Sequence, residues 1–174
     1  MPGHHFKYTI LFLLLVHVQV IVFNNVLLGN YLNPQVYVLF ILILPVAVKG
    51  WLLLLLSFLL GLTIDAFSDS MAIHAASSVF MAFCRPGVIR FVAGRIPVDE
   101  PVIPSISQLG GFTIILYSII LIFLHHSLLF FLEIFRTDEL MQTLSRILLN
   151  SGLTLVFVFL GFALLEGIFQ DKRK

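Results

Sequence analysis

Six runs of mostly apolar residues, separated by short polar or Gly/Pro-containing stretches, constrain the fold of this chain more than any other feature. The runs cover approximately residues 8–23, 35–48, 51–67, 71–84, 109–131 and 147–169. A membrane-crossing helix needs about 20 mostly apolar residues, and shorter runs can extend into their flanks or thin the bilayer. The mean hydropathy is +1.09 and only 11% of the residues are charged. We therefore predict a single all-α integral membrane domain over residues 1–174, with about six transmembrane helices.

The distribution of Lys and Arg between alternate loops predicts the orientation, because cytoplasmic loops carry the excess of these residues. One set of segments holds eight of them, and the other holds two, Arg136 and Arg146. The set of eight comprises Lys7, Lys49, Arg85, Arg90, Arg95, Lys172, Arg173 and Lys174. We therefore expect both termini in the cytoplasm. The first run is expected to remain as a helix, because Asn24 and Asn25 stand where a signal peptide would have small residues.

The inner stretch from 85 to 105 mixes apolar residues with Arg85, Arg90 and Arg95, and three prolines follow these arginines within it. We interpret the three arginines as cytoplasmic anchors to anionic lipid headgroups. A dedicated partner site is the alternative.

The stretch from 61 to 76 predicts a helical hairpin with a tight turn. Asp65 lies near the outer end of one helix, and His74 lies at a similar depth on the returning helix. Gly61 is one turn from Asp65 on the same face, where a small residue permits close helix approach. Asp69 or Ser70 is expected to cap the N–H groups that open the second helix. Two interpretations stay open: the polar pair holds the hairpin together, or it contributes to binding.

Further polar residues fall within the later and first runs. An outward-facing cavity is expected, and its candidate lining residues are His125, Asn150, Asp65 and His74. The same group includes His126, Ser151, Thr154, His17 and Gln19. Adjacent histidines point about 100° apart on a helix, so His125 and His126 form no ready chelate. We expect no metal and no cofactor.

Several kinds of chemistry have no matching sequence pattern. The chain has no P-loop, no Gly-x-Ser-x-Gly elbow, no His-Glu-x-x-His and no paired intramembrane aspartates. Its one cysteine, Cys84, excludes an internal disulfide. We expect no catalytic residues and no nucleic-acid partner.

The hairpin sequence resembles the rod shape-determining MreD family, in the form found in Bacteroidetes-type bacteria. The resemblance covers the whole chain in length, span number and orientation. It is sharpest at Gly61-Leu62-Thr63-Ile64-Asp65-Ala66-Phe67, His74-Ala75-Ala76 and Ala82-Phe83-Cys84-Arg85-Pro86. That form usually has an Asn-Thr turn after the aspartate and a glycine before the histidine, where this chain has Asp69-Ser70 and Ala72.

The resemblance implies a non-catalytic inner-membrane scaffold of the peptidoglycan elongation complex, involved in rod shape. Its partners would be the bitopic protein MreC and, indirectly, MreB and the RodA–PBP2 synthase pair. It also implies a fold similar to the substrate-binding components of energy-coupling-factor transporters. A small-molecule-binding transporter subunit is therefore the alternative function, although the scaffold interpretation expects no small-molecule substrate. An intramembrane enzyme would need a nucleophile or metal set that the sequence does not offer.

Overall fold

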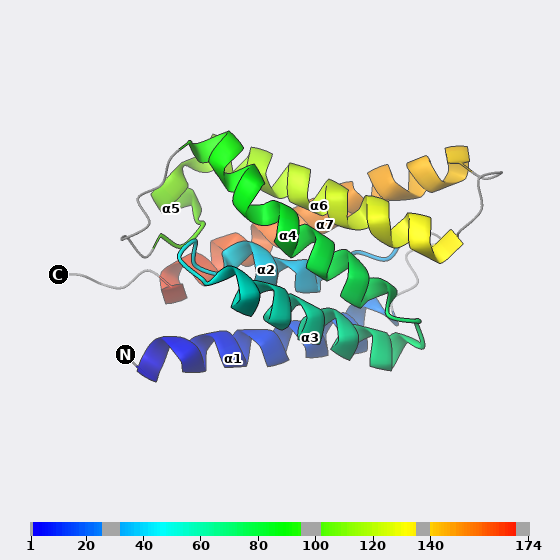
Figure 1. Cartoon of the computed structure of the whole chain (residues 1–174), viewed down its shortest axis with the longest axis horizontal. Coiled ribbons are helices and arrows are strands. Elements are labelled where there is room, and N and C mark those ends of the chain that lie inside the picture. Colours follow the sequence, from blue (N-terminus) through cyan, green and yellow to red (C-terminus); the bar gives the residue numbers. More distant parts are fainter. Residues whose placement is uncertain (1, 26–31, 95–101, 135–139, 170–174) are drawn as a thin grey trace.

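The structure, a computed structural model, describes residues 2–25, 32–94, 102–134 and 140–169. The helices in chain order are α1 (Pro2–His17), its π-helical continuation η1 (Val18–Phe23), the 3-10 turn η2 (Val36–Val38), α2 (Leu39–Ile43), α3 (Gly50–Ser68), α4 (Ile73–Ala93), α5 (Ile106–Leu109), α6 (Gly111–Ile134) and α7 (Leu140–Phe169) (Figure 1). Among the described residues, five helical segments are long and apolar enough to cross a membrane, at Phe6–Phe23, Gly50–Ser68, Ile73–Ala93, Gly111–Ile134 and Leu140–Leu165. The chain is thus an all-helical, multi-pass membrane protein.

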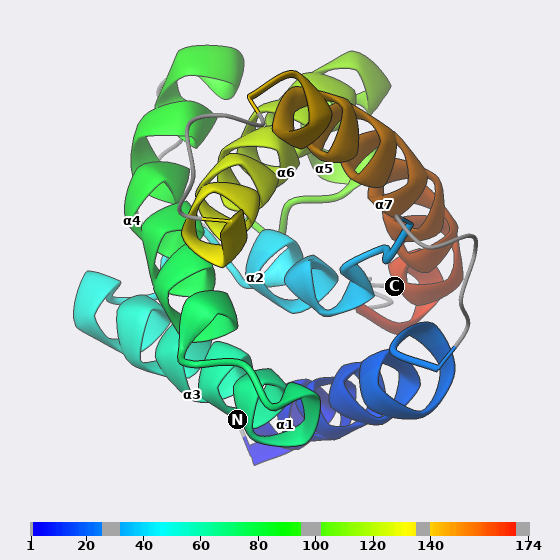
Figure 2. The ribbon, with the colours of Figure 1, turned by 90° about the vertical axis from the view of Figure 1, so that its right-hand side faces the viewer.

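The five long helices surround a short central one. Helix α3 packs against α1 and α4, α6 packs against α4 and α7, and α2 lies inside the ring that they form (Figure 2). Every residue from 34 to 44 is buried, and we call this stretch the central segment. It supplies much of the apolar core, to which α1, α3, α4, α6 and α7 also contribute.

The central segment is not the continuous helix that the sequence predicts over 35–48. Helix is present only from residue 36 to residue 43, a length of about 13 Å against a hydrocarbon core of about 30 Å. Pro45 explains the early end, because a residue that precedes proline is driven to extended backbone, and Leu44 has ψ 142°. Non-helical backbone at membrane depth must be covered by protein, and the ring of long helices provides that cover.

The bounds of other helices also differ from those predicted, most of all in α4 and α7. Helix α4 was expected to end at residue 84 but continues through Pro86 to Ala93, and α7 begins at Leu140 rather than at residue 147. Helix therefore occupies much of the stretch that was expected to lie at the inner membrane surface. Arg95 falls outside the described residues.

The helix ends gather at two opposite ends of the bundle. The first turn of α1 and the last turn of α7 lie at the same end (Figure 1). The opposite end, which we call the turn end, holds the α3–α4 turn, the end of η1, the end of α6 and the start of α7 (Figure 1).

Candidate functional site

The carboxylate of Asp65 joins the last turn of α3 to the first turn of α4. Its Oδ1 accepts hydrogen bonds from Ser70 Oγ (2.5 Å) and from the backbone N–H of His74 (3.0 Å), and lies 3.0 Å from His74 Nδ1. Its Oδ2 accepts the backbone N–H of Ala75 at 2.8 Å. Asp65 is only 4% exposed. A carboxylate at the start of a helix satisfies free N–H groups and is stabilised by the helix dipole, so the predicted Asp65–His74 pairing is present.

Gly61 allows the two helices of this hairpin to come into backbone contact. A Cβ on Gly61 would lie 2.5 Å from Ala75 Cα and 2.5 Å from the His74 carbonyl oxygen. Real Cβ atoms do not approach backbone so closely, so any larger residue must push α3 and α4 apart. The small residue that the sequence places one turn from Asp65 is therefore required by the crossing.

The turn between the helices contains two left-handed residues that are not glycine, Asp69 (φ 50°) and Ala72 (φ 59°). Asp69 ends α3 and is exposed, and Ala72 precedes α4 without a side-chain cap. The expectation that Asp69 or Ser70 caps α4 is therefore wrong. Asp65 is the cap, and Ser70 instead bonds to the Asp65 carboxylate and lies 3.0 Å from His74 Nδ1.

Gln19 holds the beginning of the central segment. Its Oε1 accepts the backbone N–H groups of Val36 (2.7 Å) and Tyr37 (3.4 Å), and its Nε2 donates to the Pro34 carbonyl (3.2 Å) and to Asn24 Oδ1 (3.0 Å). Gln19 is fully buried within the π-helical turn η1. It satisfies backbone groups that a broken helix in a membrane would otherwise leave without partners.

Two residues of α7 also accept hydrogen bonds from the backbone at the beginning of the central segment. Asn150 Oδ1 accepts the backbone N–H of Asn33 at 2.6 Å, and Thr154 Oγ1 accepts that of Gln35 at 3.0 Å. Both side chains are fully buried. Polar residues that looked like cavity lining are thus hydrogen-bond partners of the central segment.

The two histidines of α6 are also fully buried. The Tyr37 hydroxyl lies 2.9 Å from His125 Nε2, which links the central segment to α6. His126 Nδ1 lies 2.9 Å from the Ile122 carbonyl of its own helix, and its Nε2 lies 3.3 Å from Thr154 Oγ1. The pair therefore connects α6 to the central segment and to α7.

Arg85 holds the other end of the central segment and does not act as a surface anchor. It is 3% exposed, its Nε donates to the Tyr117 hydroxyl at 2.8 Å, and its Nη2 donates to the Leu44 carbonyl. Tyr117 in turn donates to the Leu42 carbonyl at 3.1 Å. The anchor assignment is wrong for Arg85, because these partners let α4 carry a charge within the bundle; Arg90 is exposed.

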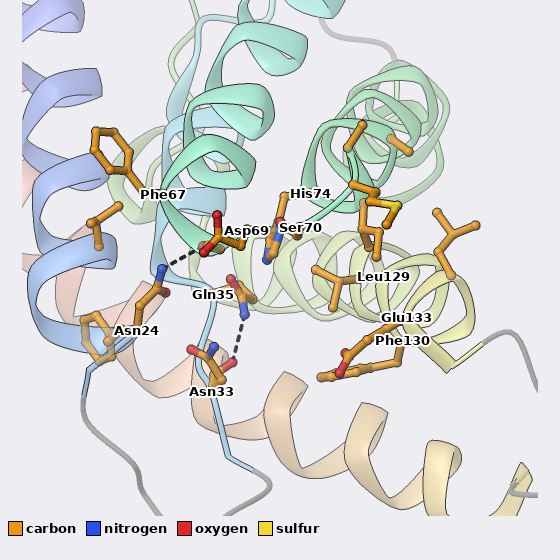
Figure 3. A pocket seen from close by; sticks show the side chains of 18 of the residues that line it. Asn24, Asn33, Gln35, Phe67, Asp69, Ser70, His74, Leu129, Phe130 and Glu133 are labelled. Atoms are coloured by element: carbon orange, nitrogen blue, oxygen red, sulfur yellow. Dashed lines mark hydrogen bonds between the residues drawn. The ribbon is translucent and has the colours of Figure 1, made fainter.

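An open depression of about 1180 Å³ lies at the turn end (Figure 3). Asn24, Asn33, Gln35, His74 and Glu133 are among the residues that line it. His125, Asn150 and Asp65 are not. The expected cavity lined by these three with His74 is therefore wrong, because His125 and Asn150 are fully buried and bond to Tyr37 and to the backbone of Asn33.

The described residues offer no group of three or more His, Cys, Asp or Glu side chains that could hold a metal ion. The histidines and the aspartate that the sequence singles out are instead joined to backbone groups, to one another and, for His125, to the Tyr37 hydroxyl. Their chemical effect is to fix helices and to satisfy a broken backbone.

Sequence reasoning missed two contributors, Tyr37 and Tyr117, and missed the role of Gln19. Pro45 inside an apolar run was the available signal, because it predicts a helix end whose free carbonyls need donors. Comparisons with family models, with curated proteins and with solved structures find no match to this chain.

Proposed function

We propose that this chain is a non-catalytic inner-membrane scaffold of the bacterial cell-elongation complex, which binds MreC and through it MreB and the RodA–PBP2 pair. The observation that carries the proposal is the hairpin. Gly61, Asp65 and His74, which carry the resemblance to the MreD family, form one contact unit in which each residue has a defined physical role.

The left-handed backbone of Ala72 adds support. The MreD form that this chain resembles usually has glycine before the histidine, and Ala72 has φ 59°. Glycine is the residue that adopts this conformation without steric penalty. The expected family residue therefore fits the backbone found in this turn.

The scaffold proposal is also supported by how the buried polar groups are used. Gln19, Asn150, Thr154 and Arg85 all bond to the backbone at the two ends of the central segment. A side chain committed to such a bond is a poor candidate for a nucleophile or a base. The function therefore resides in the shape and faces of the bundle.

We further propose six passes with both termini in the cytoplasm, the central segment being the second pass. The chain runs back along the bundle between α1 and α3, and α3 begins and α4 ends near the end that holds the start of α1 (Figure 1). Lys49 directly precedes α3, and Arg90 lies in the last turn of α4. That end would be cytoplasmic because Lys and Arg accumulate there. The turn end would face outward.

Affinity purification of the tagged chain from its native membranes tests the scaffold proposal. We expect MreC to be recovered, with the synthase pair in substoichiometric amount. An unrelated tagged multi-pass protein from the same membranes is the control. Reproducible absence of MreC would overturn the proposal.

The transporter-subunit alternative keeps one supporting observation, the depression at the turn end. A ligand-binding subunit needs an accessible concave site with a few polar groups. The same purification separates the two functions, because a transporter subunit would recover an ATPase module and a coupling subunit in place of MreC.

A further inference from the structure

The depression at the turn end lies where membrane lipid headgroups sit. The ends of η1, α3 and α6 and the starts of α4 and α7 surround it (Figure 1, Figure 3). These are ends of helices that are long and apolar enough to cross the bilayer, so their termini lie at the boundary between the hydrocarbon and the headgroups. Its volume of about 1180 Å³ exceeds the roughly 300–1,000 Å³ of an ordinary small-molecule pocket.

The floor of the depression presents an unused hydrogen-bond acceptor on Gln35. This residue is 2% exposed, and its Nε2 donates to the Asn33 carbonyl at 3.2 Å, which fixes the orientation of the amide. Its Oε1 is buried and has no hydrogen-bond partner among the residues that the structure describes. Buried polar atoms in native proteins are rarely without a partner, so this acceptor is available to a bound molecule.

His74 adds a second acceptor to the same depression. Its Nδ1 lies 3.0 Å from the Asp65 carboxylate, and the neutral tautomer that donates to this carboxylate carries its proton on Nδ1. Nε2 is then left with a lone pair. Asp69 also lines the depression and contributes a negative charge near its rim.

Arg146 presents a donor on another wall. Its Nη2 donates to Glu133 Oε1 at 2.9 Å, and its guanidinium carbon lies 4.7 Å from the centre of the Phe130 ring. Its Nε is buried, and no described residue forms a hydrogen bond with it. The depression therefore offers hydrogen-bond acceptors at Gln35 and His74 and a cationic donor at Arg146.

Apolar side chains complete the lining. Leu129, Leu132 and Ile73 belong to it, as does Met71, which is 93% exposed. Such a wall suits an amphiphile whose polar group meets the floor and whose hydrocarbon lies along the helices.

We propose that this depression binds a phospholipid whose headgroup carries a primary ammonium and a phosphate, the chemistry of phosphatidylethanolamine. The ammonium donates to Gln35 Oε1 and His74 Nε2, and a phosphate oxygen accepts from Arg146 Nε. A trimethylated ammonium has no N–H to donate, so phosphatidylcholine lacks the property that the floor requires. This site goes beyond the proposed scaffold function and does not depend on it.

Native mass spectrometry and thermal unfolding of the purified full chain test the proposal. The probes are phosphatidylethanolamine, phosphatidylcholine and phosphatidylglycerol with identical acyl chains. We expect phosphatidylethanolamine to be retained and to raise the unfolding temperature, with binding at least about tenfold tighter than that of the other two. Equal binding of phosphatidylethanolamine and phosphatidylcholine, or retention as an adventitious additive only, would overturn the proposal.

Variants locate the site, and a soluble probe identifies the source of the headgroup. Two variants, Gln35→Met and Arg146→Gln, should each weaken phosphatidylethanolamine binding about tenfold. The control variant Gln142→Met changes an exposed position of α7 and should leave binding unchanged. Arg146→Gln keeps the test valid if Gln35→Met fails to fold. Free phosphoethanolamine should bind far more weakly than the lipid. Equal affinity would overturn the lipid assignment in favour of a soluble ligand.

Discussion

The hairpin and the central segment both contain buried polar groups, but the hydrogen-bond partners of these groups are near in sequence in the hairpin and far away in the central segment. In the hairpin, Asp65 finds its partners five to ten residues away in the chain. At the beginning of the central segment, the backbone N–H groups of Gln35, Val36 and the preceding Asn33 bond to side chains 17 to 119 residues away. A local turn can be recognised in the sequence because its partners are neighbours, whereas a short, broken helix inside the bundle depends on the whole ring of helices.

From this difference we predict that substitution of Asp65 destabilises the protein more than any other substitution in the hairpin. Asp65→Asn replaces one carboxylate oxygen by an amide that faces N–H donors, so we expect a loss of about 3 kcal/mol of folding stability. Asp69→Asn is the matched control, because Asp69 is exposed and Asn tolerates the left-handed backbone. Protein level and thermal unfolding in detergent measure both variants. Normal level with lost association to MreC would assign Asp65 to binding.

The close helix crossing gives the next largest effect. Gly61→Ala places a Cβ against the backbone of α4, and overpacking of this kind destabilises by about 2 kcal/mol. Gly87→Ala on α4 meets no atom within 4 Å and should be neutral or stabilising. Unfolding temperatures of the two variants that agree within error would show that the helices separate freely.

A smaller effect is expected at the entrance of the central segment. Gln19→Leu leaves the N–H of Val36 and the carbonyl of Pro34 without this partner, which should destabilise by about 1.5 kcal/mol. Gln142→Leu at an exposed position serves as the control. Hydrogen exchange at residues 36–38 should increase in Gln19→Leu. Unchanged exchange there would mean that the ring of helices alone holds the segment.

The smallest effect has the opposite sign. Ala72→Gly relieves the left-handed strain at φ 59° and should stabilise by about 0.5 kcal/mol, because the gain exceeds the entropy lost by glycine. Ala76→Gly, within α4, should instead destabilise by about 0.5 to 1 kcal/mol. Thermal unfolding compares the pair. A loss in Ala72→Gly would contradict the strain argument.

The apolar runs and the hairpin could be predicted because both depend on residues that are close in sequence. Runs near 20 residues in length require burial in lipid, and Asp65, Gly61 and His74 lie on adjacent turns of two helices joined by a short loop. Their contact follows from spacing alone. The capping role of Asp65 was missed because the choice among Asp65, Asp69 and Ser70 depends on turn dihedrals.

The tertiary structure decided what the remaining polar residues do. Composition and hydropathy already fixed an all-helical membrane protein, because so apolar a chain cannot use water as its main solvent. They could not distinguish a cavity lined by His125 and Asn150 from a core in which these side chains hold a short, broken helix. That distinction depends on whether another part of the chain fills the space. The segment from 34 to 44 fills it because Pro45 shortens its helix and the polar side chains of η1, α4, α6 and α7 satisfy its backbone and its tyrosine.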